Sequence, residues 1–140
     1  RMRRSIKISN KRYELATNAY TPIAYKNEFG QDFFKDLLGL LKNKQLVAQL
    51  NQLEKGNDLV AESVDLSLLE DFDITFFYRL FWVFAKSGNP KIKPFDDFFM
   101  EMEEFPLDEV CPLMMEMLNT VLQTKKKQTH QKQQAKKPSR

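Results

Sequence analysis

The stretch over residues 72–84 limits how this chain can fold more than any other feature, because seven of its 13 residues are aromatic. Its apolar residues do not fit on a single stripe of a helix. A helix that is apolar around most of its circumference lies at the centre of a core or is covered by a second subunit. Arg79 in its middle and the short length both argue against a membrane span. The sequence therefore predicts a globular domain built around this helix.

Apolar residues recur at three- and four-residue spacing through much of the remaining chain, which is typical of amphipathic helices. Thr21-Pro22 as a start and Gly30 as a stop predict a helix over 22–29. Asp32 can cap a longer helix that reaches about residue 54, with Gly39 and Asn43 weakening its middle. Further helices are predicted over 59–70, where the pattern is weaker, and over 72–86, 95–105 and 106–122.

The N-terminal residues have a different pattern. Ser5–Ile8 and Tyr13–Ala16 alternate polar and apolar residues on either side of a turn-like Ser9–Arg12, which predicts a β-hairpin over about residues 5–16. Two strands are not stable alone, so they must pack on the helices or extend a sheet of a neighbouring subunit. We therefore predict a mainly α fold, with one helical domain over residues 1–122 that includes the hairpin. A disordered basic tail is expected over residues 123–140.

Charge is strongly segregated along the chain. Residues 1–12 carry six basic side chains and residues 123–140 carry seven, and neither end has an acid. The body between them therefore has nine basic residues against all 19 acids, a net charge of −10. Basic ends can bind nucleic acid through its phosphates, which is one alternative function. The acidic body and the lack of aromatic residues in the tail argue against specific nucleic-acid binding.

The usual catalytic constellations are missing from the sequence. His130 is the one histidine and lies in the predicted tail, and Cys111 lies in an apolar helical stretch typical of a buried thiol. Zinc sites, Ser-His-Asp triads and Cys-His pairs therefore cannot be assembled, and the four glycines form no phosphate-binding loop. Neighbouring acids such as Asp96 and Asp97 leave a metal-assisted enzyme as a weak alternative. We expect no enzyme activity, no catalytic residue, no metal site and no cofactor.

Protein binding is the function that the composition allows. The aromatic stretch 72–84 can be a core helix alone, or a core helix that also contacts another subunit. Five methionines within residues 100–117 could form a deformable groove, although simple core packing explains them as well.

Residues 21–37, with the sequence TPIAYKNEFGQDFFKDL, follow a TPxxYKxxFGxDFxxDL-like pattern after the predicted hairpin. This arrangement resembles the tail assembly chaperones of long-tailed bacteriophages and Gram-positive prophages. The aromatic helix ending at Ala85-Lys86, and Phe95–Phe99 followed by an acidic helix, are also similar to that family. The resemblance spans about residues 13–122 and rests on residue types, without an invariant signature.

The resemblance implies that the chain coats the helical tape measure protein, keeps it soluble and presents it to tail tube protein, without catalysis. It also implies self-association, no membrane contact, action in the cytoplasm of the infected bacterium and absence from the finished virion. Tail tube protein would be recruited by a longer product of ribosomal frameshifting, with Lys125–Lys127 marking a conceivable slippery site. The candidate binding residues are Phe77, Phe81, Trp82, Phe98, Phe99 and Met114. A structural head–tail joining protein, which would stay in the particle, remains a further alternative.

Overall fold

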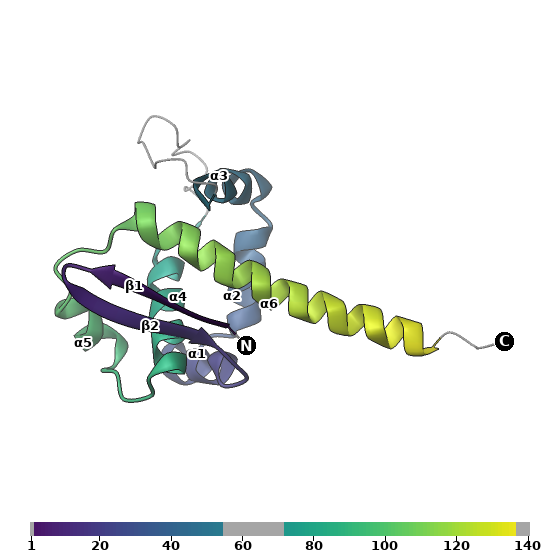
Figure 1. Cartoon of the computed structure of the whole chain (residues 1–140), viewed down its shortest axis with the longest axis horizontal. Helices are drawn as coiled ribbons and strands as arrows, with labels where there is room; N and C mark the ends of the chain where they lie inside the picture. Colours follow the sequence, from purple (N-terminus) through teal and green to yellow (C-terminus); the bar gives the residue numbers. More distant parts are fainter. Residues whose placement is uncertain (1, 55–71, 137–140) are drawn as a thin grey trace.

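The computed structural model describes residues 2–54 and 72–136, with side chains described for 2–49 and 72–122. The elements, in chain order, are β1 (Met2–Ile8), β2 (Lys11–Thr17), α1 (Thr21–Phe29), α2 (Phe33–Leu41), α3 (Lys44–Glu54), α4 (Thr75–Gly88), α5 (Phe95–Met100) and α6 (Leu107–Lys136). A hairpin lies on one side of a group of helices, and α6 crosses the molecule and extends beyond it (Figure 1). The predicted mainly α class with an N-terminal hairpin is confirmed. The helix predicted over 59–70 lies outside the described residues.

The hairpin is longer than predicted, because its strands pair from Met2 opposite Thr17 to Ile8 opposite Lys11. Ser9 and Asn10 have φ angles of 50° and 68°, the left-handed pair that a two-residue type I′ turn requires. This turn has the right-handed twist of the strands it joins, so it holds the antiparallel register.

The long helix predicted from Asp32 is two helices in the structure. Asp32 caps α2 by accepting a hydrogen bond from the Phe34 amide at 3.4 Å. Asn43 lies between α2 and α3, and its side-chain oxygen accepts a hydrogen bond of 3.0 Å from the Leu46 amide. The weak point expected at Asn43 is therefore a break, because asparagine is a good N-cap and starts a new helix.

The aromatic helix α4 forms the centre of the core, and it contacts β2, α1, α5 and α6. Seven consecutive or near-consecutive side chains on it are almost fully buried: Phe76, Phe77, Leu80, Phe81, Trp82, Val83 and Phe84. The Trp82 indole donates a hydrogen bond of 2.9 Å to the Lys93 carbonyl, so its one polar atom is satisfied. Burial around most of the circumference therefore explains the aromatic composition.

The backbone of α6 is helical to Lys136, through most of the basic stretch over residues 123–140. Lysine, glutamine and alanine are good helix formers, and the first proline after Pro112 is Pro138, so nothing in the local sequence interrupts the helix. Figure 1 shows this second half of α6 projecting away from the other elements. None of the helices in the described part of the chain has the length and apolarity needed to cross a bilayer.

Candidate protein-binding groove

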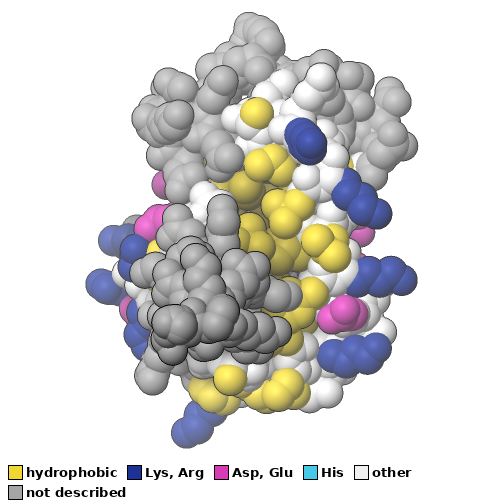
Figure 2. All heavy atoms as spheres, turned by 90° about the vertical axis from the view of Figure 1, so that its right-hand side faces the viewer, with side chains coloured by type: hydrophobic (Ala, Val, Ile, Leu, Met, Phe, Trp, Pro, Cys, Tyr) yellow, Lys and Arg dark blue, Asp and Glu magenta, His cyan; other side chains and the backbone are white. Residues whose placement is uncertain are grey.

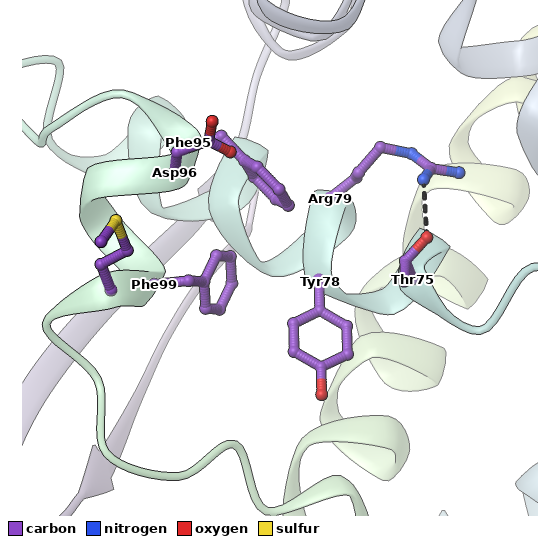
Figure 3. Close-up of a pocket in the computed structure, with 7 residues that line it drawn as sticks. Thr75, Tyr78, Arg79, Phe95, Asp96 and Phe99 are labelled. Carbon is purple, nitrogen blue, oxygen red and sulfur yellow. Dashed lines mark hydrogen bonds between the residues drawn. The ribbon is translucent and has the colours of Figure 1, made fainter.

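An open groove of about 560 Å³ lies between α4 and α5. Its lining residues are Thr75, Tyr78, Arg79, Phe95, Asp96, Phe99 and Met100. Phe95 and Phe99 point from α5 towards α4, which carries Tyr78, while Arg79 turns away from α5 towards Thr75 (Figure 3). Met100 at the edge of the groove is 82% exposed, the largest exposed fraction among the large apolar side chains described. We call this feature the α4–α5 groove.

Local sequence explains how α5 presents its aromatic rings. Pro94 precedes the helix, and Phe95 and Phe99 are four residues apart, so both rings lie on one face, 5.1 Å apart between centroids. The Glu28 carboxylate from α1 accepts a hydrogen bond of 2.8 Å from the Phe95 amide. This contact fixes the start of α5 against α1, although α5 has no fully buried residue.

Aromatic rings packed against one another support the groove. Tyr78 lies 5.3 Å from Phe99 and 4.2 Å from Phe105 between ring centroids, and Phe99 lies 5.4 Å from Phe105. Most of these pairs meet edge to face, an arrangement worth about 0.5–1.5 kcal/mol per pair beyond the area buried. The groove wall is therefore preformed by packing, with Phe99 half-buried and Met100 facing solvent.

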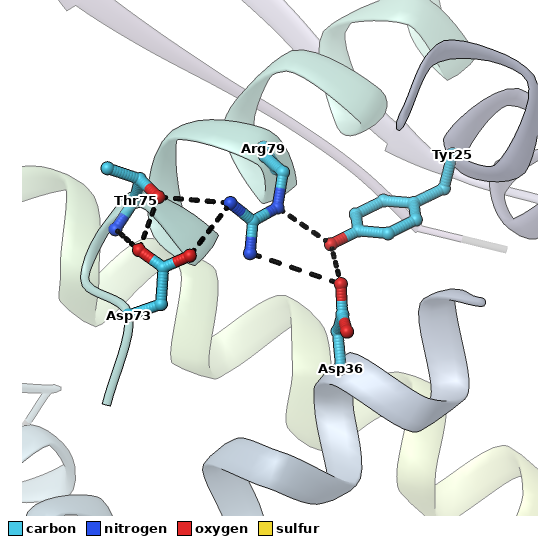
Figure 4. Close-up of polar contacts among 5 residues, drawn as sticks. All are labelled: Tyr25, Asp36, Asp73, Thr75 and Arg79. Carbon is cyan, nitrogen blue, oxygen red and sulfur yellow. Dashed lines mark hydrogen bonds and ion pairs between the residues drawn. The ribbon is translucent and has the colours of Figure 1, made fainter. Parts of the chain in front are cut away.

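Beside the groove, Arg79 is the centre of a polar cluster that links three helices (Figure 4). Its Nε donates to the Tyr25 hydroxyl at 3.0 Å, and one terminal nitrogen donates to Asp73 at 3.2 Å and to Thr75 at 3.0 Å. The other terminal nitrogen lies 3.9 Å from Asp36. All three guanidinium nitrogens therefore have partners, which is what an arginine in an apolar helix needs.

The cluster also shifts two pKa values. Burial, and then the hydrogen bond that the hydroxyl donates to Asp36, raise the pKa of Tyr25 far above its usual value. A hydrogen bond from the Thr75 hydroxyl holds the pKa of Asp73 below its usual value. Tyr25 therefore stays neutral and Asp73 stays charged near neutral pH, so neither is suited to proton transfer there.

Four of the six sequence-predicted binding residues lie in the core. Phe77, Phe81, Trp82 and Met114 are at most 2% exposed, so in this structure they support the surface without forming it. Phe98 and Phe99 are half-buried, and of these two only Phe99 lines the α4–α5 groove.

Six of the seven groove-lining residues were missed by the sequence-based selection, and the large apolar ones among them are Tyr78, Phe95 and Met100. The four-residue spacing of Phe95 and Phe99 was a usable signal, because it places both rings on one face of α5. Tyr78 and Met100 carried no such signal, because the sequence pattern does not distinguish either of them from the apolar residues beside it.

Phe98 lines a second hollow of about 490 Å³, between the hairpin and the connection from α4 to α5. This hollow is charged, with Arg12 paired to Glu14 at 2.9 Å and Lys93 paired to Glu101. Lys11 and Lys91 also line this hollow, so its charged lining is basic overall, and it lacks the apolar character of the α4–α5 groove.

The described residues offer little support for a metal site or for a reactive thiol. Within them, no three His, Cys, Asp or Glu side chains gather in a way that could hold a metal ion. Burial, with a smaller effect of Asp108, raises the pKa of the Cys111 thiol to about 12. A thiol with such a pKa is protonated at neutral pH and is a poor nucleophile.

Comparisons with known proteins gave no relative: no family model matches the chain, and neither a curated protein nor a solved structure matches it.

Proposed function

We propose that the chain is a non-catalytic binding protein, and that it acts as a tail assembly chaperone for the tape measure protein of a long-tailed bacteriophage or prophage. The observation that carries this proposal is the α4–α5 groove, in which aromatic and methionine side chains are presented to solvent. The sequence resemblance at residues 21–37 supplies the identity of the partner. Assembly would take place in the host cytoplasm, and the protein would be absent from the virion.

The volume of the groove is large enough to accept apolar side chains of a partner helix. Its volume of about 560 Å³ is within the usual range for sites that bury an apolar ligand. An amphipathic helix places anchors at positions i, i+3, i+4 and i+7 along such a groove. Burial of two or three anchors supplies about 1.5–3 kcal/mol each, from which the cost of association is subtracted. This balance gives reversible binding, as a chaperone that releases its client requires.

Self-association is part of the proposal and is supported by a different surface. Figure 2 shows apolar side chains in a band on the face from which α6 projects, where α1 and α2 also lie in Figure 1. Ile23 on α1 and Leu38 on α2 are each 56% exposed. Large exposed apolar side chains on two helices in contact favour binding of another protein surface. A second copy of this chain would cover this α1–α2 face, while recruitment of tail tube protein would need the longer frameshifted product.

Co-expression with the tape measure protein of the same phage tests the proposal. We expect that protein to move from the pellet to the soluble fraction and to co-purify with the chain. Mass analysis of purified particles should then detect the tape measure protein without the chaperone. A tape measure protein that stays insoluble would contradict the proposal, and a chain that remains in the particle would favour the head–tail joining alternative.

A further inference from the structure

We infer that the α4–α5 groove prefers an amphipathic partner helix whose apolar ridge is bordered by Lys or Arg side chains. The inference rests on the proposed function, because it concerns the same groove. It adds the charge of the partner segment, which neither the resemblance nor the apolar lining specifies.

The groove-lining residues and the residues in polar contact with them carry an excess of negative charge. Asp96 lines the groove, and Glu28 holds the Phe95 amide at 2.8 Å. Asp73 and Asp36 lie at 3.2 Å and 3.9 Å from the Arg79 guanidinium. Among the groove-lining residues and those with a polar contact to them described above, four carboxylates therefore stand against one guanidinium, a net charge of −3.

Arg79 does not offset this charge for an incoming partner. Its side chain is 17% exposed, and its three nitrogens are occupied by Tyr25, Asp73, Thr75 and Asp36. Asp73, in contrast, is 61% exposed, and Asp96 is also exposed. Asp73 already accepts hydrogen bonds from Thr75 and Arg79, so the exposed Asp96 is the carboxylate that a cationic side chain would meet in the groove, while an acidic one would meet like charge with no free guanidinium to receive it.

A second copy of the chain is the competing occupant. Lys26, Lys35 and Lys42 are exposed on or next to α1 and α2, whose apolar face also carries Ile23 and Leu38. This α1–α2 face has the same chemistry as the partner helix that we infer. If a second copy fills the groove, substitutions in the groove must lower the oligomeric mass of the protein, and the mass therefore has to be measured together with binding.

Two fluorescently labelled helical peptides provide the test with the full chain. Both carry the same leucine ridge, and the flanking positions are all lysine in one and all glutamate in the other. Fluorescence anisotropy at low salt should show the lysine peptide binding about tenfold more tightly, an advantage that shrinks as salt is added. Equal affinities, or tighter binding of the glutamate peptide, would overturn the inference.

Matched variants locate the effect. Asp96→Asn keeps the shape of the side chain and should weaken binding of the lysine peptide about two- to fivefold, the range of a partly exposed ion pair. Asp108→Asn removes an exposed carboxylate from the first turn of α6, outside the groove lining, and should leave the affinity unchanged. Equal effects of the two variants, or a lower oligomeric mass of Asp96→Asn, would also overturn the inference.

Failure of this inference differs from failure of the proposed function. If the tape measure protein co-purifies with the chain but the two peptides bind equally, the charge preference is wrong and the chaperone proposal stands. If the lysine peptide is preferred but the tape measure protein stays insoluble, the inferred charge preference is correct. The groove then binds a client other than the tape measure protein.

Discussion

The Tyr25 hydroxyl donates a hydrogen bond of 2.6 Å to the Asp36 carboxylate and accepts one of 3.0 Å from Arg79. These contacts join α1, α2 and α4, although Arg79 lies 54 residues from Tyr25 in the sequence. Tyr25 is fully buried, and its ring also meets Phe29 and Phe33 edge to face. The cluster therefore fixes how the N-terminal helices sit against the core helix that forms one wall of the groove.

Replacement of Tyr25 tests whether this cluster stabilises the fold. Tyr25→Phe keeps the ring but leaves Asp36 and Arg79 each without one hydrogen bond in a half-buried site. We expect the free energy of unfolding in urea to fall by about 1–3 kcal/mol. Tyr20→Phe, at an exposed tyrosine, is the matched control and should change it by less than about 0.5 kcal/mol. Similar values for the two variants would show that the cluster does not stabilise the fold.

The same tyrosine predicts a dependence of stability on alkaline pH. In the folded protein the pKa of Tyr25 lies above the usual tyrosine value of 10.0, so both states are protonated well below pH 10 and its contribution is fully present there. Above pH 10 the unfolded chain loses the proton first, so the free energy of unfolding falls. The stability difference between wild type and Tyr25→Phe should therefore shrink between pH 9 and pH 11. A difference that stays constant over this range would contradict the pKa shift.

Two glycines provide a matched pair for packing. A Cβ at Gly88 would lie 3.0 Å from the Glu14 carbonyl oxygen, because the end of α4 packs directly on the backbone of β2. Overpacking of this kind costs about 1–3 kcal/mol, so Gly88→Ala should be destabilising even after its gain in helix propensity. Gly39 in α2 has no atom within 4 Å of such a Cβ, and Gly39→Ala should gain about 0.5–1 kcal/mol. Thermal unfolding should move in opposite directions for the two, and a shift in the same direction would contradict the contact.

Cys111 should be inert in the folded state. It is buried, and burial raises the pKa of its thiol to about 12. A thiol reagent at pH 8 should label the native protein far more slowly than the urea-unfolded protein, where the single cysteine reacts completely. Rapid labelling of the native protein would show that Cys111 is not buried as described.

The sequence predicted the elements well because their signals are local. The turn at Ser9-Asn10, the stop at Gly30 and the buried helix around Trp82 each depend on a few neighbouring residues. The break at Asn43 was only partly visible, since a cap and a weak helical position look alike in sequence.

The candidate site was less predictable, because it depends on how distant segments meet. Asp36, Asp73 and Tyr25 come from separate segments, and nothing in the sequence pairs them with Arg79. The aromatic density of residues 72–84 also hid the difference between Phe77, which is buried, and Tyr78, which lines the groove. Both residues fit the same apolar sequence pattern, and only the position of α5 shows which of them lines the groove.

We propose that the α4–α5 groove binds the tape measure protein, and co-expression of that protein with two matched variants tests this binding. Met100→Lys puts a positive charge at the edge of the groove, and Ala48→Lys puts the same charge on α3, outside the groove lining and the α1–α2 face, both at exposed positions that should not affect folding. We predict that the soluble, co-purifying fraction of the tape measure protein falls to the level without chaperone for Met100→Lys and persists for Ala48→Lys. Full solubilisation by folded Met100→Lys would contradict binding in this groove.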